Sequence, residues 1–565
     1  NGWRGSQLYK GNVTLTSGRI PRLGPRAYGA MRLVYALGSM QERSLGGERG
    51  FGFDPFKALL NDPYDLGRIW FTIWQAVVST LLTLAVGLPA AFLFARYEFP
   101  GKTLLKAVST LPFVMPTIVV AMGFTALFGS QGILNSALES VFRLDGPPVR
   151  ISNSLTIIFM AHAFYNYAII VRIVSALWSN LDPNLEHSAK VLGAGSFRAF
   201  YHVTLPMLLP AIISASLLAF AFSFTSFGVV LVLGGPEFAT LEVAIYELTA
   251  KLFRLPLAGA LSIIQLGFTY FFLLLYSRFQ ERSVVRMDLK PREATARRPR
   301  RLGDKVFVAA MVLILLAMLS PLIALIVRWI TFDGGFGTAQ MANLFSNDRG
   351  SYFYLSPVKI IWNSLRFAFT TVAISLVIGT IISYFIINTR RKWRNIADAL
   401  VMLPLGVSAV TLGFGYIIAL GRPPLDLRGS WLILVIAHSL VAYPFVIRSL
   451  LPVLKGMNPN LKEAAAVLGA SPSRVFLLVE LPMIAPALLV GATFAFAVSM
   501  GEFGASLILV RAEFTTMPVA IFRFLGLPGA SNLGMALGMS VLLMSVVAVG
   551  FIAIERFRYK GVGGF

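Results

Sequence analysis

One carboxylate lies inside a long apolar stretch of this 565-residue chain. Glu502 interrupts the segment MIAPALLVGATFAFAVSMGEFGASLILV, which carries no other charge. An ionised carboxylate in such a segment costs about 2.5–3.5 kcal/mol or more unless it faces water or a partner. We therefore predict that Glu502 lines a solute path, and the alternative is a structural hydrogen bond. Ring faces attract cations, so Phe227 and Phe503 would suit a cationic solute on that path, although most phenylalanines of a membrane chain pack or face lipid.

Other patterns that could carry chemistry are incomplete. The chain has no cysteine, which excludes disulfides and thiolate metal sites. Of its four histidines, His162 and His438 are equivalent by the repeat and have no carboxylates nearby, so we predict packing roles for these two and no metal site. Gly101–Lys102–Thr103 resembles the end of a phosphate-binding loop, but Arg96 stands where that loop requires glycine. We expect no catalytic residue and no cofactor bound by this chain.

The elements that position these residues are membrane helices. Hydrophobic residues make up 56% of the chain and its mean hydropathy is +0.73, which excludes a soluble globular protein. Apolar runs of about 20 residues, the length that spans a bilayer as a helix, recur throughout. We predict an all-α polytopic bundle with about 11 membrane helices. They lie near 69–95, 104–128, 155–178, 207–233, 257–277, 306–330, 363–388, 399–420, 431–451, 483–509 and 533–554.

The net charge of +23 is concentrated at helix ends. Arginine and lysine cluster at 278–301 and 390–394, which is typical of cytoplasmic loops and argues against a nucleic-acid surface. With these loops inside, residues 1–67 should lie outside, yet they carry several basic residues. Either a first membrane helix is missing or degenerate, or the beginning of the sequence is foreign to the rest.

A polar segment occurs twice. Residues 181–210 align without a gap on 457–486, so that Pro183 pairs with Pro459 at a shift of 276 positions. The second copy begins with Asn and Pro, continues through alanine-rich helix formers and stops at Gly469, which predicts a short helix, a glycine hinge and a second short helix. A surface-lying loop without a partner is the alternative interpretation.

The repeat extends over most of the chain. The same shift pairs His162 with His438 and Ser226 with Glu502, which adds Ser226 to the predicted path. Upstream the shift is 292, as between Gly87 and Gly379, so the first half carries about 16 extra residues. Both halves keep the same side inside, which predicts parallel repeats related by a pseudo-two-fold axis along the membrane normal, with a path between them.

The two loops resemble a known motif. Glu463–Ala464–Ala465, three residues, Gly469, nine residues, Val479, one residue and Leu481–Pro482 is similar to the EAA loop of bacterial ATP-binding-cassette importer permeases. The first copy keeps Ala189, Gly193, Leu205 and Pro206, but His187 and Ser188 replace the initial Glu-Ala, and Glu186 comes one position early. The resemblance implies that these residues couple the chain to ATPase subunits.

The resemblance also implies partners, location and substrate. We expect two copies of a cytoplasmic ATPase that bind ATP and Mg, an extracytoplasmic solute-binding protein, and a multi-pass place in a bacterial inner membrane. Fused halves are similar to permeases for thiamine and for ferric iron, and residues 161–172 and 223–247 look most like the thiamine branch. We therefore expect transport of thiamine or its phosphates, with ferric iron second, and no enzyme activity or nucleic-acid partner.

The predicted organisation has four parts. Residues 1–67 form an N-terminal segment, 68–277 the first permease half, 278–305 a basic cytoplasmic linker, and 306–565 the second half with one extra leading helix. A secondary transporter driven by an ion gradient is the alternative function, because such proteins are also built from parallel repeats. It would need no duplicated loop and would usually carry several intramembrane charges.

Overall fold

The computed structural model describes residues 46–47, 50–51, 53–235, 237–283, 296–332, 355–390, 397, 401, 404, 407–421 and 426–561. Within these ranges the elements are helices, apart from a two-residue pairing of β1 (Gly46–Gly47) with β2 (Gly50–Phe51). The predicted all-α class is confirmed. Predictions for residues 1–45, for 284–295 of the linker and for 391–396 of the second basic loop lie outside the described residues.

The helices before the linker form a continuous series. They are α2 (Asp54–Asn61), α3 (Pro63–Arg96), α4 (Lys102–Val108), α5 (Leu111–Val114), α6 (Thr117–Phe128), α7 (Ile133–Phe142), α8 (Leu155–Asn180), α9 (Pro183–Val191), α10 (Ser196–Ala199), the π-helix η2 (Phe200–Thr204), α11 (Leu205–Phe224), α12 (Gly228–Leu233), α13 (Leu241–Tyr246), the π-helix η3 (Glu247–Lys251) and α14 (Leu255–Ser283).

The helices after the linker follow a similar plan. They are α15 (Leu302–Met318), α16 (Ser320–Ile330), α18 (Pro357–Asn388), α20 (Ala409–Leu420), η6 (Leu427–Gly429), α21 (Leu432–Gly456), α22 (Pro459–Val467), α23 (Pro472–Val475), the π-helix η7 (Phe476–Glu480), α24 (Leu481–Gly501), α25 (Gly504–Leu509), η8 (Ala512–Phe514), α26 (Met517–Leu525) and α27 (Ala530–Gly561).

Nine helical spans of the described chain are long and apolar enough to cross a membrane, or ten if α15 and α16, bent by 46°, count as one span. The predicted number was about 11. The difference lies at 399–420, where α20 covers only Ala409–Leu420. The side chain of Ser408 accepts hydrogen bonds from the backbone of Val410 and Thr411 and so caps a helix start inside the apolar run. Hydropathy cannot detect such a start.

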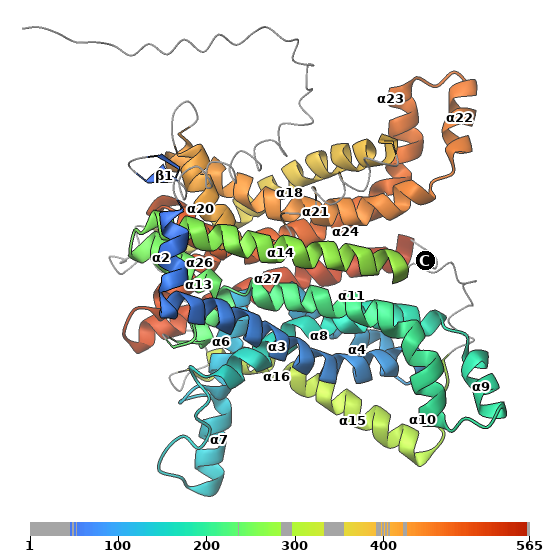
Figure 1. Cartoon of the computed structure of the whole chain (residues 1–565), viewed down its shortest axis with the longest axis horizontal. Coiled ribbons are helices and arrows are strands. Elements are labelled where there is room, and N and C mark those ends of the chain that lie inside the picture. The colour runs from blue at the N-terminus through green and yellow to red at the C-terminus, as the bar shows by residue number, and fades with distance from the viewer. Residues whose placement is uncertain are drawn as a thin grey trace, which may run out of the picture.

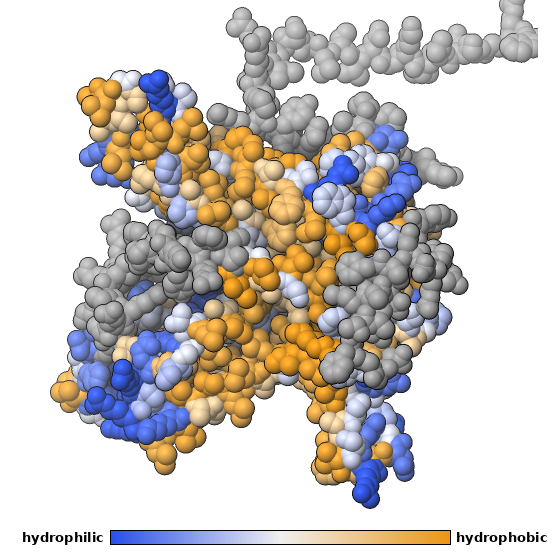
Figure 2. Space-filling view, turned by 180° about the vertical axis from the view of Figure 1, so that it is seen from behind, coloured by the Kyte–Doolittle hydropathy of each residue, from blue (hydrophilic) through white to orange (hydrophobic). Residues whose placement is uncertain are grey.

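The long helices run side by side, and both repeated loops project from the same end of the bundle (Figure 1). Helices α9 and α10 leave at one corner of that end and α22 and α23 at the other, whereas α2, α13 and α26 lie at the opposite end. Hydrophobic residues form a broad band across the middle of the molecule, and hydrophilic residues gather at the ends (Figure 2). This arrangement agrees with parallel repeats in a membrane.

The two halves repeat the same close helix crossing. A Cβ atom on Gly87 of α3 would lie 2.6 Å from Cβ of Ile170 on α8, and one on Gly379 of α18 would lie 2.7 Å from Cγ1 of Val446 on α21. Each glycine lets its helix approach the neighbour closely, which is a common device in membrane helix packing. The largest apolar core then joins the halves, because it gathers residues of α6 with residues of α16, α26 and α27.

Candidate functional site

Each repeated loop begins with a capped helix. The side chain of Asp182 accepts a hydrogen bond of 3.0 Å from the backbone N–H of Asn184 at the start of α9. Asn458 accepts an equivalent bond of 3.0 Å from Asn460 at the start of α22. Proline occupies the first turn of both helices, where its missing N–H costs nothing. The predicted first short helix is present in both copies.

Each of these helices ends at a glycine with a left-handed backbone. The φ angles of Gly193 and Gly469 are +88° and +80°. The N–H of the following alanine donates back to a carbonyl of the helix, from Ala194 to Ala189 and from Ala470 to Ala465, at 3.0 Å and 3.1 Å. This is a Schellman ending, in which glycine avoids the strain that a side chain would cause. No atom crowds a Cβ at either position, so backbone conformation alone demands glycine.

The predicted second short helix is wrong in one respect. It is the first part of the next membrane helix, since α10, η2 and α11 follow without a break, as do α23, η7 and α24. Leu205–Pro206 and Leu481–Pro482 lie just after the π-turns. Proline lacks an N–H and crowds the carbonyl one turn earlier, and a wider turn accommodates both effects without ending the helix.

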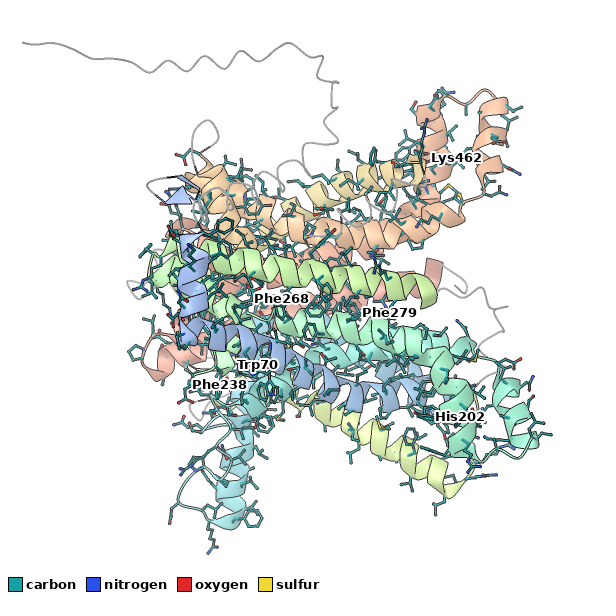
Figure 3. All side chains as sticks on the ribbon, viewed as in Figure 1. Trp70, His202, Phe238, Phe268, Phe279 and Lys462 are labelled. Carbon is teal, nitrogen blue, oxygen red and sulfur yellow. The ribbon has the colours of Figure 1, made fainter. Side chains whose placement is uncertain are left out.

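The tips of the loops expose aliphatic side chains. Val191 and Leu192 are 87% and 88% exposed, and the equivalent Val467 and Leu468 are both 87% exposed. We call these two pairs the apolar tips. Both loops stand at the same end of the molecule, where Lys462 of α22 and His202 of η2 mark the two corners (Figure 3). The apolar tips lie outside the helical spans of the described chain that are long and apolar enough to cross a membrane.

The loops are anchored differently. Lys462 Nζ lies 2.7 Å from Glu480 Oε1, and the hydroxyl of Tyr384 donates to the other oxygen of Glu480, which ties α22 to η7 and α18. In the first copy Glu186 occupies the position of Lys462 and pairs with Lys190 of its own helix at 2.9 Å. Glu463 is exposed on α22. The loops therefore share a shape but not a charge pattern.

Two predicted path residues meet at the interface of the halves. The rings of Phe227 and Phe503 stack with centroids 5.5 Å apart and planes inclined by 27°. Tyr246 packs edge-on against Phe227 at 5.5 Å, and Phe522 packs edge-on against Phe503 at 5.4 Å. The shift of 276 positions relates Phe227 to Phe503 and Tyr246 to Phe522, so these four rings surround the pseudo-two-fold axis. We call them the axial aromatic cluster.

The cluster lies toward the end opposite the loops. Helix α11 starts at Leu205 beside its loop and rises about 30 Å over its 20 residues before Phe227 is reached. Helix α13, which carries Tyr246, accordingly lies at the far end of the bundle from α9 (Figure 1). Phe227, Phe503 and Tyr246 are buried and Phe522 is partly buried. The axis is therefore closed by aromatic rings near the end opposite the repeated loops.

Glu502 is buried beside the cluster and caps a helix. Its carboxylate accepts hydrogen bonds of 2.9 Å from the backbone N–H of Ala505 and of Ser506, and one of 2.7 Å from the Ser506 hydroxyl. His438 Nε2 lies 3.4 Å away. These groups hold the break between α24 and α25. In this conformation Glu502 makes the structural hydrogen bonds that were the alternative interpretation, and its path-lining role stays a prediction.

The equivalent break in the first half uses no acid. His162 Nε2 lies 2.8 Å from the hydroxyl of Ser226, and His162 Nδ1 lies 2.9 Å from that of Ser79. His438 is placed similarly, with Nδ1 2.8 Å from the Ser499 hydroxyl. Both ring nitrogens of each histidine thus have partners, which fits the packing roles predicted for them.

Glu502→Ala is expected to lower the thermal stability of the purified protein. It removes the acceptors of two backbone N–H groups, and each buried group left without a partner costs about 1–3 kcal/mol. Glu502→Gln keeps one acceptor oxygen and should lie between Ala and wild type. Melting in detergent and solute uptake, measured on the same preparations, separate the roles. If Gln abolishes uptake at an unchanged melting temperature, Glu502 lines the path.

Sequence reasoning missed three groups at this interface. Tyr246 and Phe522 complete the axial aromatic cluster, and the shift of 276 positions applied to aromatic residues would have found them. Glu242 of α13 is a second buried acid and is 0% exposed. It stands in the apolar segment ATLEVAIY, and the search that singled out Glu502 would have identified it had it covered this shorter helix.

Comparison with known proteins gives independent findings. The family described as "Binding-protein-dependent transport system inner membrane component" matches residues 84–285 and 375–559. The thiamine transport system permease protein ThiP of Brucella abortus (strain 2308) is 27% identical over 516 residues, which cover 88% of this chain and 90% of that protein. ThiP of Haemophilus influenzae (strain ATCC 51907 / DSM 11121 / KW20 / Rd) is 24% identical and covers 95% of this chain and 97% of that protein.

A solved structure is also similar. The crystal structure of a bacterial ABC transporter involved in the import of the acidic polysaccharide alginate contains a chain 18% identical to this one. The match covers 45% of this chain and 90% of that chain, with a TM-score of 0.39.

Proposed function

Because this chain belongs to the family of binding-protein-dependent transport system inner membrane components, we propose that it imports thiamine or a thiamine phosphate with energy from separate ATPase subunits. Family membership makes it a multi-pass permease of the inner membrane with two fused halves, and a transport subunit rather than an enzyme. The substrate, the ATPase subunits and the coupling residues are the parts proposed here.

The repeated loops support docking of ATPase subunits. Two equivalent loops at one end of the bundle suit two copies of one partner, and the apolar tips offer each copy an aliphatic contact. Burial of such exposed aliphatic surface is favourable by about 25 cal/mol per Å². The residues proposed for coupling are those of the two loops, with Gly193 and Gly469 setting their shape. ATP and Mg would be bound by the partners.

The axial aromatic cluster supports a gate at the outer end. When ATP closes the ATPase dimer, the two loops would be drawn together, and the halves would separate where Phe227 meets Phe503. A solute-binding protein docked at the outer end would then release its solute into the opening. Hydrolysis and product release would let the loops move apart and the four rings close again.

Thiamine is the substrate that the observations favour. The single observation that carries this choice is the similarity to ThiP proteins along most of the chain. Aromatic faces on the axis add a physical reason, because the thiazolium ring of thiamine is a cation and ring faces attract cations. Ferric iron was the second substrate expected from the sequence, and the uptake experiment below distinguishes it from thiamine.

Uptake in proteoliposomes tests the substrate. The permease is reconstituted with its ATPase, a solute-binding protein and labelled thiamine, and we expect ATP-dependent accumulation that unlabelled thiamine suppresses. The matched control replaces ATP by ADP on the ATPase side. Accumulation of ferric iron under the same conditions, without accumulation of thiamine or its phosphates, would contradict the choice of thiamine.

A further inference from the structure

Glu242 is a buried acid whose hydrogen-bond partners are neutral. It lies on α13 and one carboxylate oxygen accepts a hydrogen bond from Nε2 of Gln265 on α14. The other oxygen accepts from the hydroxyl of Ser408, just before α20. Burial raises the pKa of the Glu242 carboxyl to about 8, so the closed interface favours its neutral form. Contact with water would restore its charge, so the ionisation of this acid is coupled to opening of the interface.

The partners of Glu242 come from both halves. Glu242 and Gln265 belong to the helices before the linker, whereas Ser408 follows it. Thr411 of α20 extends the contact, since its hydroxyl donates to Oε1 of Gln265 at 2.9 Å. The four side chains are buried. Separation of the halves would break the bonds from Ser408 and Thr411 and leave the carboxylate without one of its two donors.

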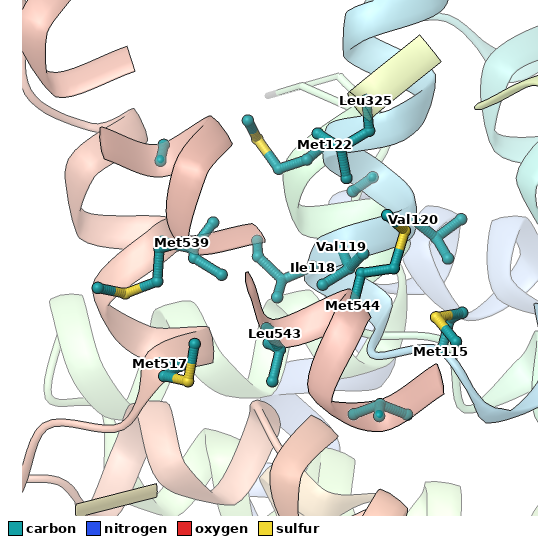
Figure 4. Packing of buried hydrophobic residues seen from close by; sticks show 14 of the residues in the cluster. Met115, Ile118, Val119, Val120, Met122, Leu325, Met517, Met539, Leu543 and Met544 are labelled. Atoms are coloured by element: carbon teal, nitrogen blue, oxygen red, sulfur yellow. The ribbon is translucent and has the colours of Figure 1, made fainter. Parts of the chain in front are cut away.

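None of the four equivalent positions on the other side of the axis carries a polar side chain. The shifts of 276 and 292 positions place Pro518, Val541, Pro116 and Val119 where Glu242, Gln265, Ser408 and Thr411 lie. Val119 packs there in the apolar core with Met517 and Met539 (Figure 4). This fold therefore closes the same interface with apolar side chains at these positions, and the acid on one side is not a requirement of closure.

Glu242 also lies next to the gate. Tyr246 of the axial aromatic cluster follows it by one helical turn on α13, and residues four apart lie on the same helix face. Glu242 has a hydrogen-bond partner in the other half, whereas the partners of Glu502 all belong to its own half. They are Ala505, Ser506 and His438. Opening the halves leaves Glu502 capped but uncovers Glu242.

We propose that Glu242 is the acid that contacts the cationic solute when the halves separate at the outer end. Ser408 and Thr411 satisfy the polar cluster while the gate is closed, and the solute cation replaces them when it is open. The inference rests on the proposed import of a cationic solute. It makes Glu242 a specificity-determining residue and gives the opening a negative group on one side of the axis only.

Equilibrium binding to the open state tests this role. The permease is assembled with a hydrolysis-deficient ATPase, held with ATP, and titrated with thiamine and with an analogue whose uncharged thiophene ring replaces the thiazolium. Glu242→Gln is expected to weaken thiamine binding about tenfold, because a hydrogen bond or contact to a charged group is lost. Binding of the analogue should not change. Thr371→Val, which removes a buried hydroxyl of α18 outside this cluster and keeps the acid, is the matched control and should bind both as wild type does.

The outcomes separate the possibilities. Equal weakening for thiamine and the analogue would assign Glu242 to packing, and unchanged thiamine binding would remove it from the path; either result overturns the proposal. If the Gln variant does not assemble, Glu242→Asp is used instead, because it keeps the negative charge. The Asp variant should still prefer thiamine to the analogue, and loss of that preference would overturn the proposal equally. Absence of ATP-driven thiamine uptake by the wild-type complex is a separate failure, that of the proposed function.

Discussion

Replacing Leu468 by Asp is expected to release the ATPase from the second loop of the permease. Leu468 is one of the most exposed aliphatic residues of the described chain, and it stands at the tip of a loop with a fixed shape. A charge in the apolar centre of an interface must be desolvated without a partner, and such changes at central interface positions cost about 2 kcal/mol or more. Affinity should fall about 30-fold or more. Co-purification of the ATPase with tagged permease measures the loss.

Two further variants define the interpretation of that result. Leu192→Asp changes the equivalent tip of the first loop and should also reduce the amount of ATPase recovered. Leu144→Asp changes a leucine that is 43% exposed beyond α7, far from either loop, and should leave recovery unchanged. Full recovery of ATPase with Leu468→Asp and Leu192→Asp together would show that the apolar tips are not the docking surface.

The shape of the loops could be predicted from sequence because it is local. An Asp or Asn before proline, a run of helix-forming residues and a glycine specify a capped helix with a Schellman ending, and Gly193 and Gly469 have the left-handed φ that this ending requires. The repeat made the prediction stronger, since both copies keep the proline at the helix start and the glycine at its end. The segment after each glycine was harder to predict, because proline in a π-turn looks in sequence like proline at a helix start.

The gate could be predicted only in part because its contacts join distant segments. Phe227 and Phe503 were recognised as a pair by the repeat, but no periodicity shows that the two rings stack on each other. Ser408 contacts Glu242 across 166 positions of the chain. Hydropathy also treats Glu502 and Glu242 alike, whereas the first caps a helix within its own half and the second bridges the halves.

Energy coupling gives the second large effect. The permease alone, reconstituted in liposomes, is expected to hydrolyse no ATP and to accumulate no thiamine against a gradient, because its proposed energy source lies in a partner that docks on the loops. When the ATPase and the solute-binding protein are added, we expect thiamine to accumulate in the liposomes only if ATP is present. Leu468→Asp should reduce the accumulation of thiamine in proportion to the amount of ATPase that it releases.

The most direct measurement of the central claim compares the two energy sources in one preparation. Liposomes that contain the permease alone are given a proton or sodium gradient, and liposomes that contain the complete complex are given ATP. We predict uphill thiamine uptake only in the second case, and none when ADP replaces ATP. Uphill uptake by the permease alone under either ion gradient would contradict an ATP-driven importer and would favour a secondary transporter built from parallel repeats.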